Sequence, residues 1–407
     1  MSKQHRILIV TNGPLCRNPR PLKEADALGG AGYDVTVLTV RSRADCETTD
    51  RDIILDAPYR REAVDLIPGH GTGRLRLLAR RGRQWAARRL SRMLSVQSAH
   101  ALGPAGALLS RARGLPADLT IVHNEVPHWV GTRLMRAGRR VAADIEDWHS
   151  EDLLPEDRAV RPLALIRSVE RALLRDASYV TTTSGALAQA LQRRYGGHMP
   201  TVISNSFPLQ PDPHRGPVGS PPSFFWFSQT LGPGRGLELF VAAWAVTRSP
   251  SRLVLLGESA GSYRETLLRR IPAERRDQVS FLPLVAPGQL PSVIARHDIG
   301  LALEQDFIVN RGLTVTNKIL QYLNAGLAVI ASDTAGQREV LDRGPDAGII
   351  VKLTETAALA SSLEELLADP TELARRQAAA RALAEAHYCW EKQEPVLLEL
   401  VSRSLRE

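Results

Sequence analysis

Short, continuously apolar runs alternate with helical patterns along the first half of the chain. The runs predict strands at residues 6–11, 34–40, 119–123, 140–145, 179–184 and 201–204. The segments between them, such as IRSVERALLRDA, repeat apolar positions with a helical period. Buried strands that are separated by helices form a parallel sheet covered on both faces. This half is therefore predicted to be a Rossmann-like domain.

The same alternation starts again after a stretch rich in proline and glycine. This stretch, PLQPDPHRGPVGSPP at residues 208–222, predicts a linker. Six further apolar runs predict the strands of a second sheet: SFFWFSQT, RLVLLGE, VSFLPLV, DIGLALE, LAVIASD and AGIIVKL. From Glu355 onward the pattern is helical. A length of 407 residues suits two such domains.

The composition is that of an ordinary globular protein in a reducing compartment. The three cysteines, Cys16, Cys46 and Cys389, lie far apart and lack metal-ligand spacing, so we expect free thiols. The N-terminus lacks the pattern of a signal peptide, and no stretch reaches the roughly 20 apolar residues that span a bilayer. We therefore expect a cytoplasmic protein.

The net charge of +8 is concentrated in one segment. Residues 66–117 contain ten arginines and neither an acidic residue nor a lysine. Within them, residues 74–93 predict a helix with arginines around one apolar stripe, formed by Leu75, Ala79, Ala86, Leu90 and Met93. Such a helix can lie on an anionic membrane surface at the inner membrane face, or it can cover a core with its arginines solvated. With 5% aromatic residues and no recognised nucleic-acid motif, the sequence does not favour a nucleic-acid partner.

Two helix starts in the second half are candidates for anion binding. In SQTLGPGRGLELF, residues 228–240, the glycines allow the backbone to approach a ligand closely, and Arg235 adds a positive charge. A plain strand-to-helix turn is the alternative interpretation of this segment. In TNKILQYLNAG, Thr316 is a good N-cap, and Lys318 adds charge to the exposed N–H groups of the first turn. Gln321, one turn later, could meet a sugar hydroxyl. This helix start therefore predicts a site for a phosphate or diphosphate attached to a ribose.

An acidic segment, DIEDWHSEDL at residues 144–153, is the main candidate for chemistry in the first half. Such a cluster could bind a metal or supply a general base. Its spacing matches no standard set of metal ligands, so we expect none. A solvated acidic loop is the alternative.

The segment NKILQYLNAGLAVIASDTAGQREVL resembles the donor-site signature of retaining, family-four glycosyltransferases of the GT-B fold. Further segments resemble that family in the same order along the chain: NPRPLKEADALGGAGYDVTVL, VERALLRDASYVTTTSGALAQAL, VISNSF, WFSQTLGPGRGLE and HYCWEKQEPVLLELV. The similarity covers nearly the whole chain. It implies two Rossmann-like domains with parallel sheets facing across a cleft, at 1–207 and 223–386. It also implies a final helix, 387–407, that packs back on the N-terminal domain.

The resemblance also implies roles for individual residues. The donor diphosphate would contact Gly234, Arg235, Thr316, Asn317 and Lys318, and the ribose would contact Gln321. The catalytic candidates near the transferred sugar are Asp147, His149 and Glu304. Arg17 and Arg20 would lie in a loop that lines the acceptor side or approaches the diphosphate, unless they cap the neighbouring helix, and Arg311 would lie in a loop over the donor.

The chain departs from the family pattern at the donor site. Gln321 stands where the family usually has a glutamate, and Leu313 stands at the position of a second glutamate. Gln229 and Arg235 replace the usual arginine and lysine of the diphosphate loop. The resemblance implies transfer of a sugar from a nucleotide-diphosphate sugar to a glycan or lipid-linked acceptor in cell-surface polysaccharide or glycoconjugate synthesis, with no metal or other cofactor. A catalytically degenerate scaffold and a nucleotide-sugar epimerase on the same fold are the alternatives.

Overall fold

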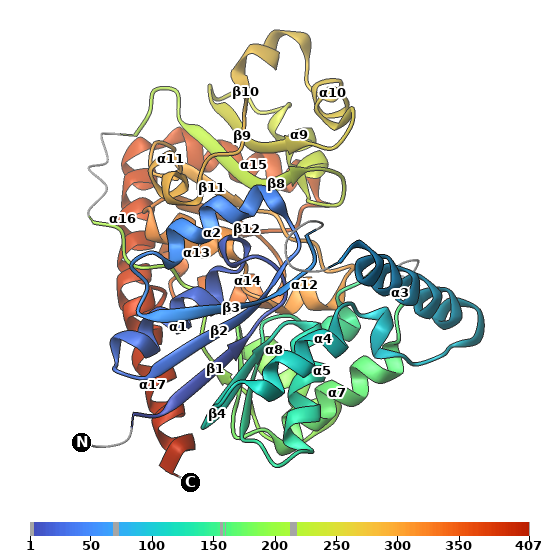
Figure 1. Cartoon of the computed structure of the whole chain (residues 1–407). Coiled ribbons are helices and arrows are strands. Elements are labelled where there is room, and N and C mark those ends of the chain that lie inside the picture. The colour runs from blue at the N-terminus through green and yellow to red at the C-terminus, as the bar shows by residue number, and fades with distance from the viewer. Residues whose placement is uncertain (1–3, 68–72, 155–157, 159, 212–217, 407) are drawn as a thin grey trace. The chain divides into compact units, whose positions relative to one another are not determined.

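The chain divides into two compact units. A computed structural model describes residues 4–67, 73–154, 158, 160–211 and 218–406 (Figure 1). The first unit comprises Met1–Ile203 together with Glu394–Glu407, and the second comprises Ser204–Gln393. Among the described helices, none is long and apolar enough to cross a membrane.

The N-terminal unit is built on a seven-stranded parallel sheet in the order β3-β2-β1-β4-β5-β6-β7. Its strands are β1 Arg6–Val10, β2 Asp34–Arg41, β3 Tyr59–Asp65, β4 Leu119–His123, β5 Val141–Ile145, β6 Val180–Thr182 and β7 Thr201–Val202. At the centre, Ile7 pairs with Val35 on one side and with Leu119 on the other. The order reverses between β1 and β4, so the carboxyl ends of these two strands mark a switch point where ligands bind in such sheets.

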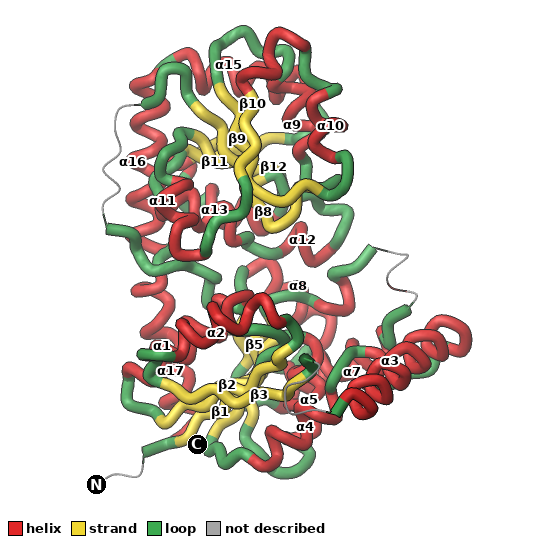
Figure 2. Tube along the Cα trace, turned by 45° about the horizontal axis from the view of Figure 1, so that its top comes forward, coloured by secondary structure: helices red, strands yellow, loops and turns green. Residues whose placement is uncertain are grey.

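Helices cover both faces of this sheet (Figure 2). They are α1 Pro19–Gly30, α2 Glu47–Ile54, α3 Arg74–Leu94, α4 Ala105–Gly114, α5 Glu125–Met135, α7 Leu163–Asp176 and α8 Gly185–Tyr195. Leu8 and Val10 pack with apolar residues of α4, α5 and α7 in one core cluster. Ile7 and Ile9 point to the opposite face and are equally buried. Burial on both faces explains why these strands have continuous apolar runs.

Two features of this unit differ from the predictions. Strand β3, YRREAVD, was not predicted, because it lies at the sheet edge, is only partly buried and carries charged residues instead of an apolar run. The helix α3 was predicted within one residue, but the stripe of Leu75, Leu90 and Met93 is exposed. The helix packs through another line of residues, which includes Leu77 and Ala87. The predicted stripe therefore does not cover a core.

The C-terminal unit has a six-stranded parallel sheet in the order β10-β9-β8-β11-β12-β13. Its strands are β8 Ser223–Leu231, β9 Arg252–Ser259, β10 Val279–Leu282, β11 Ile299–Ala302, β12 Ala328–Ser332 and β13 Gly348–Val351. Along β8, Phe224 and Trp226 belong to one buried cluster and Phe225 to another, so this sheet too has a core on each face. The two parallel sheets confirm the prediction of two Rossmann-like halves.

The helices of this unit are α9 Leu237–Trp244, α10 Tyr263–Leu268, α11 Leu290–Ile294, α12 Val309–Leu313, α13 Asn317–Asn324, α14 Ala335–Leu341, α15 Thr356–Ala368 and α16 Pro370–His387. The last helix, α17 Trp390–Arg406, begins in this unit, and its residues from Glu394 belong to the N-terminal unit. Part of the predicted linker is attached to the C-terminal unit, because the Gln210 amide N–H donates to Asn324 Oδ1 at 3.0 Å. Residues 212–217 of that linker lie outside the described residues.

Candidate functional site

A pocket of about 270 Å³ lies at the carboxyl ends of three neighbouring strands in the C-terminal unit. Its lining includes Glu304 and Asp306 after β11, Ser332 and Thr334 at the end of β12, and Lys352 after β13. Loops at this edge of a parallel sheet are where open α/β folds bind ligands. The pocket is thus formed by the part of the unit in which the sequence placed its donor-site candidates.

Positive side chains converge on Glu304 beside this pocket. Lys318 Nζ forms an ion pair with Glu304 Oε1, and each side chain is 11% exposed. Burial alone would raise the pKa of Glu304, but the ammonium of Lys318 outweighs it, and the charges of Arg235 and Arg311 act in the same direction. The pKa of Glu304 is consequently lowered. The structure therefore brings together Arg235, Arg311 and Lys318 around one ionised carboxylate.

The first turn of α13 points unsatisfied polar groups at this region. Thr316 occupies the N-cap position, as predicted, but its side chain makes no capping hydrogen bond. Its Oγ1 is buried and has no hydrogen-bond partner among the described residues. Because Asn317 and Lys318 follow directly, the free N–H groups of the turn, a buried hydroxyl and an ammonium lie close together. Such a set of donors can bind an anion. Gln321 lies one turn further along the helix and is half-buried.

The glycine-rich loop before α9 approaches β11 closely. Gly236 has a φ of +76°, and a Cβ at this position would lie 2.4 Å from the carbonyl oxygen of Leu303. Only glycine fits here without strain. Gly234 is also in the left-handed region, with the ring of Phe307 next to it. The loop is thereby held against the segment that carries Glu304, with Arg235 between the two glycines.

Asp147 and His149 lie in the N-terminal unit, after β5. Burial lowers the pKa of His149 well below its usual range, and the neighbouring His128 and Arg161 add to this effect. The ring of His149 lies 5.3 Å from that of His128, and its Nε2 is buried without a hydrogen-bond partner among the described residues. His149 is therefore neutral and a weak base at neutral pH. Asp147 is half-buried at the end of the sheet.

Glu146 is a titratable group that sequence reasoning left out of the candidate site. Burial, together with the charge of Asp147, raises the pKa of Glu146 to about 7. A carboxyl that titrates near neutral pH at a strand end is suited to general acid–base chemistry. In the sequence, nothing distinguishes Glu146 from the other acidic residues of DIEDWHSEDL. Its raised pKa, which depends on the surroundings that the fold gives it, separates it from them.

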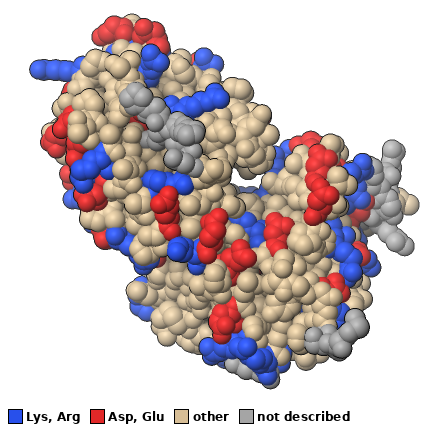
Figure 3. Space-filling view, turned by 90° about the vertical axis from the view of Figure 1, so that its left-hand side faces the viewer, with Lys and Arg blue, Asp and Glu red and all other residues tan. Residues whose placement is uncertain are grey.

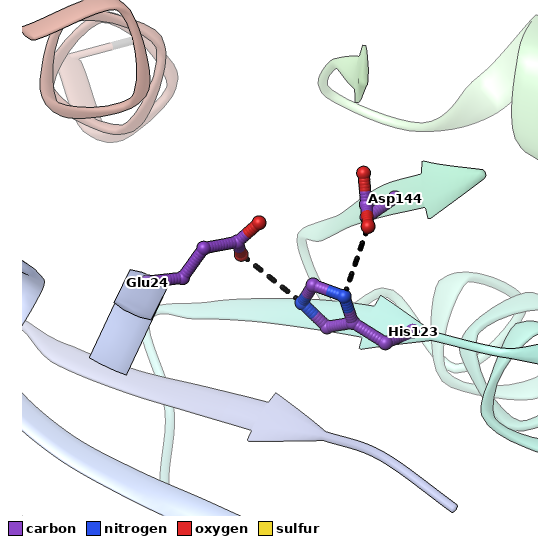
Figure 4. A group of neighbouring side chains, drawn as sticks. All are labelled: Glu24, His123 and Asp144. Carbon is purple, nitrogen blue, oxygen red and sulfur yellow. Dashed lines mark hydrogen bonds and ion pairs between the residues drawn. The ribbon is translucent and has the colours of Figure 1, made fainter. Parts of the chain in front are cut away.

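A buried group of charged residues connects α1, β4 and β5 (Figure 4). Asp144 accepts from Nε and Nη2 of Arg20 at 2.6 and 2.7 Å. His123 lies between two carboxylates, with Nδ1 3.0 Å from Asp144 and Nε2 3.0 Å from Glu24. Burial opposes protonation of His123, but Glu24 and Asp144 outweigh it and raise its pKa to about 10. The four side chains form a network of alternating charge.

Glu24, His123 and Asp144 also have the residue types of a metal site, with ligand atoms within 4.8 Å of one another. A divalent cation there would need a neutral His123 and would stand beside the guanidinium of Arg20, which already holds both oxygens of Asp144. Lys23 adds a further basic group from the same helix. The donor set does not fit a metal, and we assign these residues to an ion-pair network.

Three arginines predicted to lie in loops differ in their surroundings. Arg20 is not in a loop: it lies in the first turn of α1, is 1% exposed, and donates to Asp144 and to the carbonyl of Ile203. It therefore cannot contact an acceptor, and that prediction was wrong. Arg17 is exposed in a short 3-10 helix ahead of α1. Arg311 lies in the short helix α12 instead of a loop.

Two family models match the chain. The model described as "Glycosyl transferase 4-like domain" matches residues 19–206, and that described as "Glycosyl transferases group 1" matches residues 221–369. A curated relative is the GDP-mannose-dependent monoacylated alpha-(1-6)-phosphatidylinositol monomannoside mannosyltransferase of Corynebacterium glutamicum, which is 30% identical over 167 residues. That alignment covers 40% of this chain and 42% of the relative, so the chain spans less than half of the curated relative that it matches.

Solved structures share the fold over the whole length. Sucrose-phosphate synthase from Thermosynechococcus elongatus superposes with a TM-score of 0.71 at 16% identity, covering 98% of this chain and 99% of that one. The Anabaena protein HepE, solved with UDP-glucose, superposes with a TM-score of 0.67 at 17% identity, covering 98% and 100%. These similarities show the GT-B fold. With a glycosyltransferase family model matching each half, the chain belongs to the GT-B glycosyltransferases.

Proposed function

We propose that the protein transfers a sugar from a nucleoside-diphosphate sugar to a glycan or lipid-linked acceptor, with retention of the anomeric configuration, in cell-surface polysaccharide or glycoconjugate synthesis. The observation that carries the proposal is the convergence of Arg235, Arg311 and Lys318 around Glu304 at the start of α13. Departure of a nucleoside diphosphate leaves negative charge on its phosphates. Three cations and a helix N-terminus held in place before the reaction stabilise that charge.

The individual residues then have separate roles in the proposed reaction. Arg235 and Lys318 contact the diphosphate, together with the N–H groups after Thr316 and the backbone of Gly234. Glu304 holds Lys318 in position and remains ionised, because Lys318 keeps its pKa low. Gln321 hydrogen-bonds the ribose without the charge assistance that a glutamate would give.

The acceptor is assigned to the N-terminal unit, with Asp147, His149 and the exposed Arg17 as contacts. The mannosyltransferase of Corynebacterium glutamicum has a phosphatidylinositol mannoside in its name, which favours a lipid-linked acceptor here as well. Names of relatives support both GDP and UDP donors, since HepE was solved with UDP-glucose. The three free cysteines are compatible with a cytoplasmic site of action.

The departure at Gln321 favours a second candidate, a scaffold that binds nucleotide but has lost transfer. It shares the donor pocket with the first candidate and differs in turnover. Release of nucleoside diphosphate that depends on an acceptor extract separates the two, and turnover of the sugar nucleotide without any acceptor would instead indicate an epimerase.

The test is nucleotide binding followed by thermal shift and calorimetric titration against UDP, GDP, ADP and CMP and their sugar conjugates. We expect one diphosphate to bind, and Arg235→Ala or Lys318→Met to weaken it by about 10- to 100-fold, because each removes a charge-assisted contact of about 1.5–3 kcal/mol. Arg296→Ala, which removes an exposed arginine of the same unit, is the matched control. Unchanged affinity in both site variants would refute the assignment of the donor site.

A further inference from the structure

The helix α3 has two apolar sides, and the N-terminal unit buries one of them. Leu77, Ala87 and Ser91 are 5–7% exposed and lie along one line of the helix. The helix packs on the segment Ala99–Ala101, at the edge of the unit (Figure 1). Most of the remaining surface of the helix is exposed.

The opposite side of α3 exposes large apolar residues to solvent. At about 100° per residue, one stripe of the helix collects side chains that point away from the packed line. These are Leu75, Leu78, Trp85, Leu90 and Met93, with exposed fractions of 83%, 62%, 66%, 43% and 64%. Exposed apolar side chains scattered singly are normal, but here five large ones lie on one face of a single helix. We name these five residues the α3 stripe.

Arginines border the α3 stripe. Arg89 stands over the ring of Trp85, with 5.6 Å between its guanidinium carbon and the ring centroid. Arg81, Arg83 and Arg89 are exposed, and α3 itself contains no acidic residue that could pair with them. The face shown in Figure 3 differs, since basic and acidic side chains are interspersed on it. The absence of any acidic residue from 66 to 117 makes this region attractive to an anionic surface.

An arginine-lined pocket of about 440 Å³ lies next to the packed side of the helix. Arg80, Arg81, Arg83 and His100 line it, together with the residues that begin α4. One guanidinium nitrogen of Arg80, Nη1, is buried without a hydrogen-bond partner among the described residues. Unsatisfied donors, several positive charges and a helix N-terminus are the features that bind phosphate.

We propose that α3 is a membrane-docking helix: the α3 stripe enters the boundary between head groups and acyl chains of a bilayer, and the surrounding arginines contact the phosphates of anionic phospholipids. At 21 residues, α3 is roughly 30 Å long and can lie along the surface. The docking itself does not depend on the transferase reaction. Its use, to bring the enzyme to a lipid-linked acceptor, rests on the proposed function.

A bilayer explains both properties of α3, whereas a nucleic acid explains only one. Nucleic-acid phosphates attract arginines but give no reason for an exposed row of leucine, methionine and tryptophan. An anionic membrane offers phosphates at its surface and an apolar layer just below. Arginine at the border keeps its charge among the head groups while its stem lies over apolar surface.

The experiment is flotation of the full chain with vesicles of phosphatidylglycerol and phosphatidylcholine, in comparison with phosphatidylcholine alone. We expect binding to the anionic vesicles only, weakened by salt because the arginine contacts are screened. The double variant Leu78→Glu/Trp85→Glu should reduce the bound fraction at least about tenfold, since it places carboxylates in the apolar layer and among the lipid phosphates. Met199→Glu, at a 53% exposed apolar site elsewhere in the same unit, is the control and should bind as the unmodified chain does.

Two results would overturn the inference: no flotation of the unmodified chain at low salt, or unchanged flotation of the double variant. A dimer that the double variant dissociates, without any vesicle binding, would assign the α3 stripe to a second copy and would equally overturn it. Nucleotide binding, measured in parallel, keeps the proposals apart. A chain that binds nucleotide but does not float disproves docking alone, and a chain that floats but binds no nucleotide disproves the donor site alone.

Discussion

Removing Asp144 from the buried network should strongly destabilise the N-terminal unit. The side chains of Arg20 and Asp144 are 1% and 0% exposed, and two hydrogen bonds of 2.6 and 2.7 Å join them. Asp144 also accepts from the Thr181 hydroxyl at 2.7 Å and lies 3.0 Å from His123 Nδ1. In Asp144→Ala, Arg20 keeps, among the described residues, the carbonyl of Ile203, Glu24 at 3.8 Å and the charge of Glu146.

The cost follows from the charge that is left behind. Breaking a buried ion pair by removing one partner costs about 3–5 kcal/mol, because the remaining charge stays buried and uncompensated. For a unit of this size, about 2–4 °C per kcal/mol corresponds to a decrease of roughly 6–20 °C in its melting temperature. Replacing the pair by apolar residues, in Arg20→Met/Asp144→Leu, should recover most of the loss, since neither charge then remains.

Hydrogen exchange measured by mass spectrometry localises the effect. Peptides that contain β4 and β5 should exchange faster in Asp144→Ala, while peptides from β11 and β12 in the other unit should not change. Asp176→Ala removes the exposed pair with Arg175 and serves as the control, with an expected cost below about 1 kcal/mol. A cost below about 1 kcal/mol for Asp144→Ala, or a double variant less stable than the single one, would refute this account of the network.

Three further variants test other parts of the structure. The pKa of His123 is raised from 6.5 to about 10 in the folded protein. Its contribution to stability is therefore complete below pH 6.5 and is lost as the pH rises to about 10. His123→Gln should flatten the pH dependence of the free energy of unfolding between these two pH values. Thr316→Val should leave stability unchanged or raise it in urea unfolding, because the buried hydroxyl has no partner to lose, yet it should weaken nucleotide binding measured by titration. Gly236→Ala should cost about 1–3 kcal/mol by the same unfolding measurement, with Gly288→Ala, at an open position, as its control.

Local patterns predicted most of the fold and identified the residues of the proposed donor site. The central strands have recognisable apolar runs because both faces of each sheet are covered. The edge strand β3 was not predicted because it is only partly buried and has no such run. Glu304, after β11, and Lys318, in α13, are only 14 positions apart in the chain, so local patterns could propose both. The pairing of Arg20 with Asp144 spans 124 positions, and no local pattern contains it. The sequence likewise identified three members of the α3 stripe, Leu75, Leu90 and Met93, but not which side of that helix faces the core.

The balance of charge distinguishes the two buried clusters more clearly than their residue types do. In the N-terminal unit, Arg20, Lys23 and His123 face Glu24, Asp144 and Glu146, so bases and acids are equal in number and no charge is left over for a ligand. In the C-terminal unit, the charges of Arg235, Arg311 and Lys318 all lower the pKa of Glu304. They lie beside a pocket whose lining also includes Asp306 and Asp333, and beside a helix start with an unsatisfied hydroxyl, an arrangement that can bind an anion. We therefore propose the second cluster as the donor site and a structural role for the first.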